Sequence, residues 1–397
     1  MKRRHFLGTL AATTVSTAWA AETNSPTTVA VTSLPLVRTP LVLMAPRADG
    51  LETVWAVSRT SKGRLEWESA DGAKGQAGMD AFGFVPQDDG ILRVRLTGLK
   101  PGTSYRVRSV TVAADNDETV TSAWKNFRTL NPGGDTTRFV VWNDTHINNP
   151  TIQKLHEVTP TADFLVWNGD TCNDWTKEEL LVPTLLHPGG RDITEGRPLC
   201  LTWGNHDVRG ARAFRVASLV ATPEGRPFYA FRSGPVAAIC LHTGEDKPDA
   251  HPGFRGRVAF EALRAEQAKW LTEVIRRPEF RNAPYRVVFC HIPLRWRNET
   301  TPDYTKGGFD HFSARSRTAW HDSLVAWKTQ LIVSGHTHSP DWFPATEQFP
   351  YGQLVGGGPL PKAATWMEGT ADNRALTLKV RNLAGEQLYE VSFPPVG

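Results

Sequence analysis

The chain has 397 residues, of which 40% are hydrophobic, and this is enough apolar material for one large or two moderate domains. The formal net charge at pH 7 is only +4, and Lys2, Arg3 and Arg4 account for three of these positive charges. Proteins that bind nucleic acid usually carry a concentrated basic surface, so the composition argues against a nucleic-acid partner.

The first twenty residues have the pattern of an export signal. Residues 3–7 (Arg-Arg-His-Phe-Leu) form a twin-arginine pattern, a weakly apolar run covers 10–15, and 18–20 (Ala-Trp-Ala) supply small residues for cleavage. The apolar run is too short to span a bilayer, and the chain has no other stretch of 18 apolar residues. We therefore expect a twin-arginine signal peptide over residues 1–20, a periplasmic or extracellular protein, and no stable membrane span after signal removal.

Residues 28–131 contain short alternating runs, such as 91–96 and 105–110, which are typical of strands with one buried face. The stretch 98–105 (Gly-Leu-Lys-Pro-Gly-Thr-Ser-Tyr) resembles the start of a late strand in fibronectin type III sandwiches, where a tyrosine bonds back across the corner. This resemblance implies a fibronectin type III-like β-sandwich over residues 28–131. The Pro-Gly-Gly sequence within residues 131–135 then predicts a linker.

After this linker, five compact apolar runs have the length and character of strands that are covered on both faces. They span residues 139–142, 164–167, 199–203, 287–290 and 331–333. Between 260 and 275 the apolar spacing predicts a helix, and alternation over 376–380 and 389–393 predicts two more strands. The four cysteines, Cys172, Cys200, Cys240 and Cys290, lie in or beside apolar runs, and we expect them to be buried free thiols.

Each of the five apolar runs ends in polar groups that are able to bind a metal ion. In chain order these groups are Asn143-Asp144-Thr145-His146, Asn168-Gly169-Asp170, Gly204-Asn205-His206-Asp207, His291 and Gly335-His336-Thr337-His338. A sheet brings the ends of neighbouring strands to one edge, where loops collect such groups. Mixed imidazoles and carboxylates suit first-row divalent metals, and they leave open whether the metal is Mn, Fe or Zn.

The order of these motifs resembles that of the calcineurin-like metallophosphoesterase superfamily, over about residues 136–358. The resemblance implies an α+β fold in which the sandwich is followed by a double-sheet α/β/β/α domain over residues 136–397. It also implies two metal sites that share Asp170. One site would be formed by Asp144, His146, Asp170 and His338, and the other by Asp170, Asn205, His291 and His336.

The activity that this resemblance implies is hydrolysis of a small-molecule phosphate mono- or diester by an exported enzyme. A hydroxide that bridges two divalent ions would attack phosphorus, and His206 would protonate the leaving alkoxide. Asp207 either orients the His206 imidazole or caps the following segment, and both interpretations stay open. We expect segments 208–257 and 294–325 to form loops over the metal edge, and the candidates for substrate contact are Arg209, His242 and Arg295.

Purple acid phosphatases also join a fibronectin-like domain to this kind of catalytic domain, and the predicted architecture is similar. The sequence departs from theirs at two positions, because Asn173 stands where they have a tyrosine ligand and because their first motif lacks a histidine equivalent to His146. We therefore do not expect the ferric centre of these enzymes here, and the sequence indicates no role for Asp174. Two alternatives remain, a metal-dependent nucleotide or pyrophosphate hydrolase and, more distantly, a non-catalytic sandwich-led binding protein. The sequence leaves the oligomeric state open.

Overall fold

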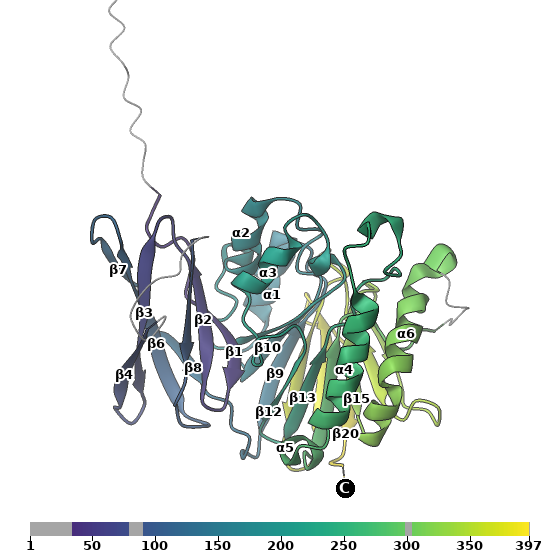
Figure 1. Cartoon of the computed structure of the whole chain (residues 1–397). Helices are drawn as coiled ribbons and strands as arrows, with labels where there is room; N and C mark the ends of the chain where they lie inside the picture. The colour runs from purple at the N-terminus through teal and green to yellow at the C-terminus, as the bar shows by residue number, and fades with distance from the viewer. Residues whose placement is uncertain (1–33, 79–89, 298–303, 397) are drawn as a thin grey trace, which may run out of the picture. The chain divides into compact units, whose positions relative to one another are not determined.

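The computed structural model describes residues 34–78, 90–297 and 304–396 (Figure 1). The expected signal peptide over residues 1–20 lies outside the described residues. Residues 35–397 form one compact unit, and the description below concerns this unit. All four cysteines are buried and free, as predicted. Among the described residues, none of the helices combines the length and the apolar character that a membrane crossing needs.

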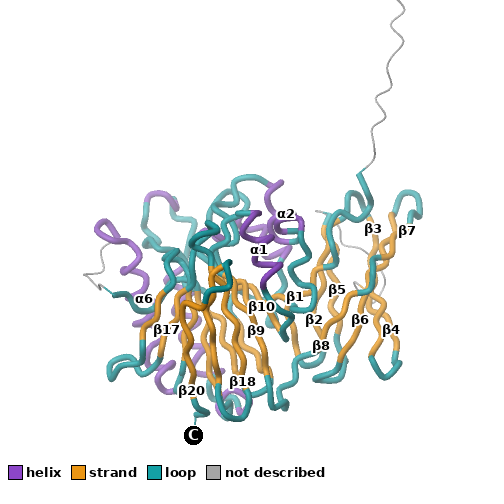
Figure 2. Tube along the Cα trace, turned by 180° about the vertical axis from the view of Figure 1, so that it is seen from behind, coloured by secondary structure: helices purple, strands orange, loops and turns teal. Residues whose placement is uncertain are grey.

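A nine-stranded sheet runs through this unit (Figure 2). Its strands, in spatial order, are β20 (Gln387–Phe393), β19 (Leu376–Asn382), β18 (Thr365–Ala371), β9 (Thr137–Trp142), β10 (Phe164–Asn168), β11 (Leu199–Thr202), β1 (Val42–Arg47), β2 (Gly50–Ala56) and β5 (Ile91–Leu96). β9, β10 and β11 are parallel neighbours that correspond to the first three predicted apolar runs. Both of their faces are buried, which explains why their sequences are continuously apolar.

A second sheet has six strands. In spatial order they are β12 (Tyr229–Ser233), β13 (Val236–Leu241), β14 (Tyr285–Cys290), β15 (Leu331–Ser334), β17 (Gly352–Val355) and β16 (Asp341–Phe343). The four inner strands are parallel. The two sheets pack face to face through one apolar core, in which the Phe139 ring stacks on Phe164 at 5.3 Å and meets Phe289 edge-on at 5.8 Å.

Helices cover the outer faces of both sheets. They are α1 (Asn149–Val158), α2 (Leu181–Leu185), α3 (Val216–Leu219), α4 (Phe260–Val274), α5 (Pro278–Arg281) and α6 (Tyr304–Ala326). α1, α2 and α3 pack on the nine-stranded sheet, and α4 and α6 pack on the six-stranded sheet (Figure 1). The region after residue 136 therefore has helix, sheet, sheet and helix layers, which agrees with the expected double-sheet arrangement.

The expectation that residues 208–257 and 294–325 form loops is wrong for parts of both segments. α3, β12 and β13 lie within the first, and α6 begins at Tyr304 in the second. The buried side chains Phe312, Ser316, Trp320 and Leu324 recur every fourth residue, which is the spacing of one helical face. Polar and charged residues between them hide this periodicity in the sequence.

The remaining N-terminal strands form a third sheet. They are β4 (Lys74–Gly78), β3 (Ser61–Ser69), β6 (Ser104–Ala113) and β7 (Thr119–Thr121), with β8 (Lys125–Arg128) also paired to β6. Side chains of this sheet, such as Leu65 and Val107, share a core with Trp55 of β2. The Tyr105 hydroxyl accepts the N–H of Lys100 at 2.9 Å, a corner contact of the kind that the resemblance implied. The fibronectin type III class itself stays a prediction.

The N-terminal strands and the strands after residue 136 are joined within the nine-stranded sheet. β1 pairs with β11 in parallel, with Met44 opposite Leu199. This pairing covers the edge of β11, which would otherwise expose unpaired backbone groups. The predicted boundary between residues 131 and 136 therefore separates two segments of sequence that both contribute strands to the nine-stranded sheet. The division into domains remains a prediction.

Lys125 of β8 connects the N-terminal strands to the loop that precedes β11. Its side chain is only 8% exposed, and Nζ donates to the carbonyl of Leu41 at 2.8 Å and to the Thr194 hydroxyl at 2.6 Å. Nζ also donates to the Asp192 carboxylate at 2.6 Å. Burial lowers the pKa of Lys125, and the charge of Asp192 opposes that shift.

Replacement of Lys125 by methionine is expected to lower the free energy of unfolding by about 3 kcal/mol, because it leaves a partly buried carboxylate without its counter-charge. Urea unfolding measures this loss. Lys100→Met is the control, since Lys100 pairs with Asp71 at the surface and its removal is expected to leave the midpoint nearly unchanged. Equal midpoints for the two variants would show that the Lys125 contacts do not stabilise the fold.

Candidate metal centre

The carboxyl ends of β9, β10, β11, β14 and β15 converge, and the loops that follow them bring the candidate ligands together. The His146 Nε2 lies 3.1 Å from the His338 Nε2, which in turn lies 3.6 Å from the Asp144 Oδ1. The ligand atoms of these three residues all lie within 4.8 Å of one another. They form the first ligand group, together with the Asp170 Oδ2 at 3.4 Å from the His146 Nε2.

A second ligand group lies on the other side of Asp170. The ligand atoms of Asp170, His291 and His336 also lie within 4.8 Å of one another. The Asn205 Oδ1 lies 2.8 Å from the His336 Nδ1, and the Asp170 Oδ2 lies 3.2 Å from the His291 Nε2. One oxygen of Asp170 thus faces both groups. This is the position that a shared ligand requires.

The backbone is strained at most of these residues. Five of the seven candidate ligands have positive φ angles, namely Asp144 (48°), His146 (44°), Asp170 (52°), His336 (72°) and His338 (57°). Residues other than glycine seldom adopt this region, and such conformations concentrate where function requires a side chain to point in a particular direction. Here the sharp turns at the strand ends direct the side chains toward one another.

Two motif glycines permit this close approach. A Cβ atom at Gly204 would collide with the carboxylate and backbone N of Asp170. A Cβ at Gly335 would collide with the Asp144 carboxylate. Both glycines precede a candidate ligand directly, so their role is to let neighbouring loops touch, rather than to supply flexibility.

The donor set fits a metal ion by a direct chemical test. The Nδ1 of His291 lies 2.9 Å from the carbonyl of Asn168 and therefore carries a proton, so the lone pair is on Nε2. That buried Nε2 has no hydrogen-bond partner among the described residues, and it faces the Asp170 carboxylate. A lone pair and a carboxylate repel each other at this distance unless a cation, either a proton or a metal ion, lies between them.

The pKa shifts describe the metal-free protein, and they also indicate that the donor set fits a metal ion. Burial lowers the pKa of His146 to about 4 and that of His336 to about 3, so both imidazoles are neutral at pH 7 and have a lone pair for a metal. Burial opposes a proton on His291, but Asp170 and Asp144 outweigh it and raise the pKa to about 10. Burial raises the pKa of Asp144 to about 8. A metal ion would replace the protons at His291 and Asp144.

The imidazole of His206 lies at the edge of this cluster and is partly exposed. Its Nδ1 contacts the carbonyl of Asn173 and lies 3.2 Å from the Asp174 Oδ1, so Nδ1 carries the proton in the neutral ring. Its Nε2 lies 3.2 Å from the Nη1 of Arg209. The Asn173 Oδ1 also lies 3.1 Å from the His146 Nδ1.

The sequence assigned no role to Asn173 or Asp174, and the structure places both against histidines of the site. Asp207 instead uses its buried carboxylate to accept the N–H and hydroxyl of Thr171 at 3.0 and 2.6 Å and the N–H of Gly204 at 2.9 Å. Asp207 thus holds the loop after β10 against the loop after β11. Asp174 lies only four residues after Asp170, and this proximity was a sequence signal that it could belong to the site. The turn that directs its side chain toward His206 could not be predicted from the sequence.

The three candidates for substrate contact have different surroundings. Arg209 lies beside His206, and its guanidinium also pairs with the buried Glu245 and with Asp246 at 2.9 Å. Arg295 is buried, donates to the carbonyls of Pro344 and Tyr351 at 2.9 and 3.1 Å, and lies over two phenylalanine rings. This packing gives Arg295 a structural role. His242 is buried in a separate pocket that lies beside Asp207.

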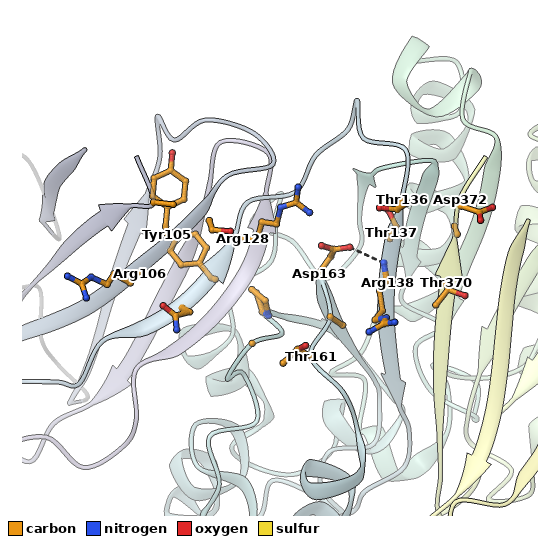
Figure 3. A pocket seen from close by; sticks show the side chains of 18 of the residues that line it. Tyr105, Arg106, Arg128, Thr136, Thr137, Arg138, Thr161, Asp163, Thr370 and Asp372 are labelled. Atoms are coloured by element: carbon orange, nitrogen blue, oxygen red, sulfur yellow. Dashed lines mark hydrogen bonds between the residues drawn. The ribbon is translucent and has the colours of Figure 1, made fainter. Parts of the chain in front are cut away.

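A larger groove, of about 1310 Å³, lies at the opposite end of β9 and β10 (Figure 3). Thr137, Arg138 and Asp163 line one side of it, and Tyr105 and Arg128 line the other. Its described lining includes none of the candidate metal ligands. The candidate metal centre is therefore identified by its donor atoms and not by the size of the cavity.

Comparison with known proteins agrees with this geometry. The profile of the calcineurin-like phosphoesterase family matches residues 137–340, which is just over half of the chain. The chain therefore belongs to the calcineurin-like phosphoesterase family. All seven candidate metal ligands and His206 lie within the matched residues.

Curated relatives match the same part of the chain. The serine/threonine-protein phosphatase CPPED1 of Homo sapiens is 23% identical over 194 residues, which cover 47% of this chain and 57% of the relative. The CPPED1 of Bos taurus is 26% identical over 195 residues, which cover 47% of this chain and 56% of the relative. The chain thus spans little more than half the length of these relatives. The family and these phosphatase relatives support the predicted class, a metal-dependent hydrolase of phosphoric esters.

Two solved structures share the fold. Purple acid phosphatase PPD1 from yellow lupin (Lupinus luteus) seeds has a TM-score of 0.67 at 14% identity, covering 90% of this chain and 75% of that one. PhoD has a TM-score of 0.59 at 13% identity, covering 89% of this chain and 88% of that one. At such identities the similarity concerns the fold alone, and it extends beyond the catalytic region into the N-terminal strands.

Proposed function

We propose that this protein hydrolyses a small-molecule phosphate mono- or diester with two divalent metal ions bound by seven side chains. These are Asp144, His146, Asp170, Asn205, His291, His336 and His338. The observation that carries the proposal is the position of the Asp170 Oδ2, which lies 3.4 Å from one ligand group's His146 and 3.2 Å from the other group's His291. Mn, Fe and Zn all suit this mixture of nitrogen and oxygen donors.

Two such ions, when bound, would neutralise the phosphoryl oxygens and make water a competent nucleophile at neutral pH. The protein's own contribution begins with charge. Asp144 and Asp170 each carry one negative charge when bound to metal, whereas Asn205 is a neutral ligand. Seven ligands with only two carboxylates leave an excess of positive charge, which attracts an anionic ester and stabilises the further charge of the transition state.

His206 is proposed to protonate the leaving oxygen. The carbonyl of Asn173 and the carboxylate of Asp174 keep a proton on Nδ1, which leaves Nε2 as the atom that exchanges protons with substrate. Arg209 is held by two carboxylates, and its Nη1 lies 3.2 Å from this Nε2. An ester oxygen at this point would receive a hydrogen bond from Arg209, and the His206 ring would transfer a proton to it in the form that carries a second proton on Nε2.

Export is a further part of the proposal and depends on the twin-arginine pattern near the start of the chain. Protein labelled at its C-terminus would be found in the periplasm or medium of its host, and substitution of Arg3 and Arg4 by lysine would retain it in the cytoplasm. Cytoplasmic accumulation of the unaltered protein would contradict export.

The central experiment measures metal and activity together. Elemental analysis of protein purified without added metal is expected to find close to two ions per chain. Assays with p-nitrophenyl phosphate and with bis-p-nitrophenyl phosphate then distinguish a monoesterase from a diesterase. Activity on either ester that survives complete removal of metal by a chelator would refute the proposed mechanism.

The Asp174→Ala variant tests how His206 is positioned. It is expected to lower turnover of an alkyl phosphate about 10- to 100-fold, the usual cost of losing a group that orients a catalytic residue. Metal content is expected to stay unchanged, and p-nitrophenyl phosphate is expected to be less affected because its leaving group needs little protonation. Asp135→Ala, at the exposed linker, is the matched control. An equal loss on both esters would assign Asp174 a merely structural role.

A further inference from the structure

A pocket of about 500 Å³ lies behind the loop that carries Asn205 and His206. Its walls come from β2 and β5, from residues 203–227 and from residues 257–263, which are far apart in the sequence. Its described lining includes none of the seven candidate metal ligands. The lining does include Trp203 and Val208, which flank the catalytic loop on both sides. The pocket is thus separate from the metal centre but in contact with the loop.

Most of this pocket is apolar. Trp203, Phe214, Val220, Phe260 and Leu263 line it. Phe214 is 70% exposed, which is unusual for a ring of this size in a folded domain. An apolar ligand in the pocket would remove this ring from water, and such burial favours binding.

The polar part of the lining has an excess of positive charge. The lining contains four arginines, Arg93, Arg95, Arg226 and Arg257, and two carboxylates, Glu52 and Asp207. Arg226 also pairs with Glu224, which lies outside the lining, so the four arginines still outnumber the three carboxylates. Glu52 is shared, because it pairs with Arg93 at 3.1 Å and with Arg95 at 3.0 Å. The carboxylate of Asp207 already accepts hydrogen bonds from the N–H groups of Thr171 and Gly204. An anionic ligand would balance this excess.

His242 adds a neutral donor. Its Nδ1 accepts the N–H of Gly244 at 3.0 Å, so the proton of the neutral imidazole is on Nε2. Burial lowers the pKa of His242 to about 3, and the ring is therefore uncharged at pH 7. Its ring stacks near Trp203, with centroids 6.2 Å apart. A buried donor beside an aromatic wall suits a ligand that has both an apolar body and an acceptor group.

We propose that this pocket binds a small amphipathic organic anion, with an aromatic body against Trp203 and Phe260 and an oxyanion head near the arginines. A ligand bound there touches both ends of the loop that contains Asn205 and His206. It is therefore placed to alter the geometry of the metal centre without occupying it. This site is independent of the ester that the metal centre hydrolyses.

The probe for this site is 8-anilinonaphthalene-1-sulfonate, an aromatic sulfonate whose fluorescence rises in apolar surroundings. Titration of the full metal-loaded chain is expected to show saturable binding of one probe molecule. Ala217→Trp, which adds an indole to an exposed position of the lining, is expected to weaken binding by about tenfold or more. Arg257→Glu, which reverses an exposed charge of the lining, is expected to weaken it several-fold.

Two control variants make the same chemical changes outside the pocket. Ala384→Trp lies in the turn between β19 and β20, and Arg255→Glu lies two residues from Arg257, and both are expected to bind the probe normally. Arg257 is at the surface, so its variant remains informative even if Ala217→Trp fails to fold. Unchanged binding by Arg257→Glu would overturn the proposal.

Discussion

Asp170→Asn is expected to lose at least one of the two metal ions and to lower turnover by about a thousandfold, equivalent to ~4 kcal/mol of transition-state stabilisation. The Asp170 Oδ2 lies within 3.4 Å of His146 and 3.2 Å of His291, so loss of its charge weakens both ligand groups. The Asp170 Oδ1 accepts the N–H of His206 at 2.9 Å, and an asparagine oxygen can still accept it. The substitution therefore removes charge while preserving the loop.

Elemental analysis and steady-state kinetics with p-nitrophenyl phosphate measure the two effects of Asp170→Asn. Asp163→Asn is the matched control, because Asp163 accepts the N–H of Arg138 at 2.9 Å at the opposite end of β10. The control is expected to keep both ions and full turnover. An Asp170→Asn protein that retains two ions at wild-type activity would show that this carboxylate is not shared.

The sequence predicted the catalytic sheets because their strands are buried on both faces and are therefore continuously apolar. β9, β10, β11, β14 and β15 each contain one of the five predicted runs almost entirely. Parallel strands bring their carboxyl ends to one edge of each sheet. The two sheets pack face to face, so residues up to 194 positions apart, such as Asp144 and His338, meet. The order and polarity of the candidate ligands predicted that they lie at strand ends, and the family resemblance implied that they form two metal sites.

Features that depend on contacts between distant segments were not predictable in this way. The pairing of β1 with β11 rests on one register contact between Met44 and Leu199, and no local pattern marks it. α6 was missed because one buried residue in four gives a weak periodic signal among many polar neighbours. In both cases the structure is decided by the partner surface and not by the segment itself.

The directions of the side chains were the other feature that the sequence could not predict. Asp207 directly follows His206 in the sequence, yet Asp174 lies beside the His206 ring, because the loop turns Asp207 toward Thr171 and Gly204. The guanidinium of Arg295 likewise turns toward backbone carbonyls. Residue type and spacing reveal which chemistry is available, but the turns at strand ends decide which groups touch.

The His206→Ala variant tests whether His206 is a general acid or a metal ligand. Both roles have to be considered because the ring lies close to two of the candidate ligands. The His206 ring lies 5.0 Å from the His146 ring, and its ligand atom lies within 4.8 Å of those of His146 and Asp170. A ligand role would predict loss of an ion from the variant. The contacts of Nδ1 with Asn173 and Asp174 favour the other role, because they hold the ring at the edge of the cluster with Nε2 directed at Arg209.

We expect His206→Ala to keep both ions and to lose about 10²- to 10⁴-fold in turnover of an alkyl phosphate, the usual contribution of a positioned acid. The loss on p-nitrophenyl phosphate is expected to be much smaller, because p-nitrophenolate leaves without a proton. His187→Ala is the control, because His187 follows α2 and belongs to none of the candidate ligand groups, and it is expected to match the unaltered protein. Purification of His206→Ala with a single ion would instead make His206 a ligand, and the proton would then have to come from another group.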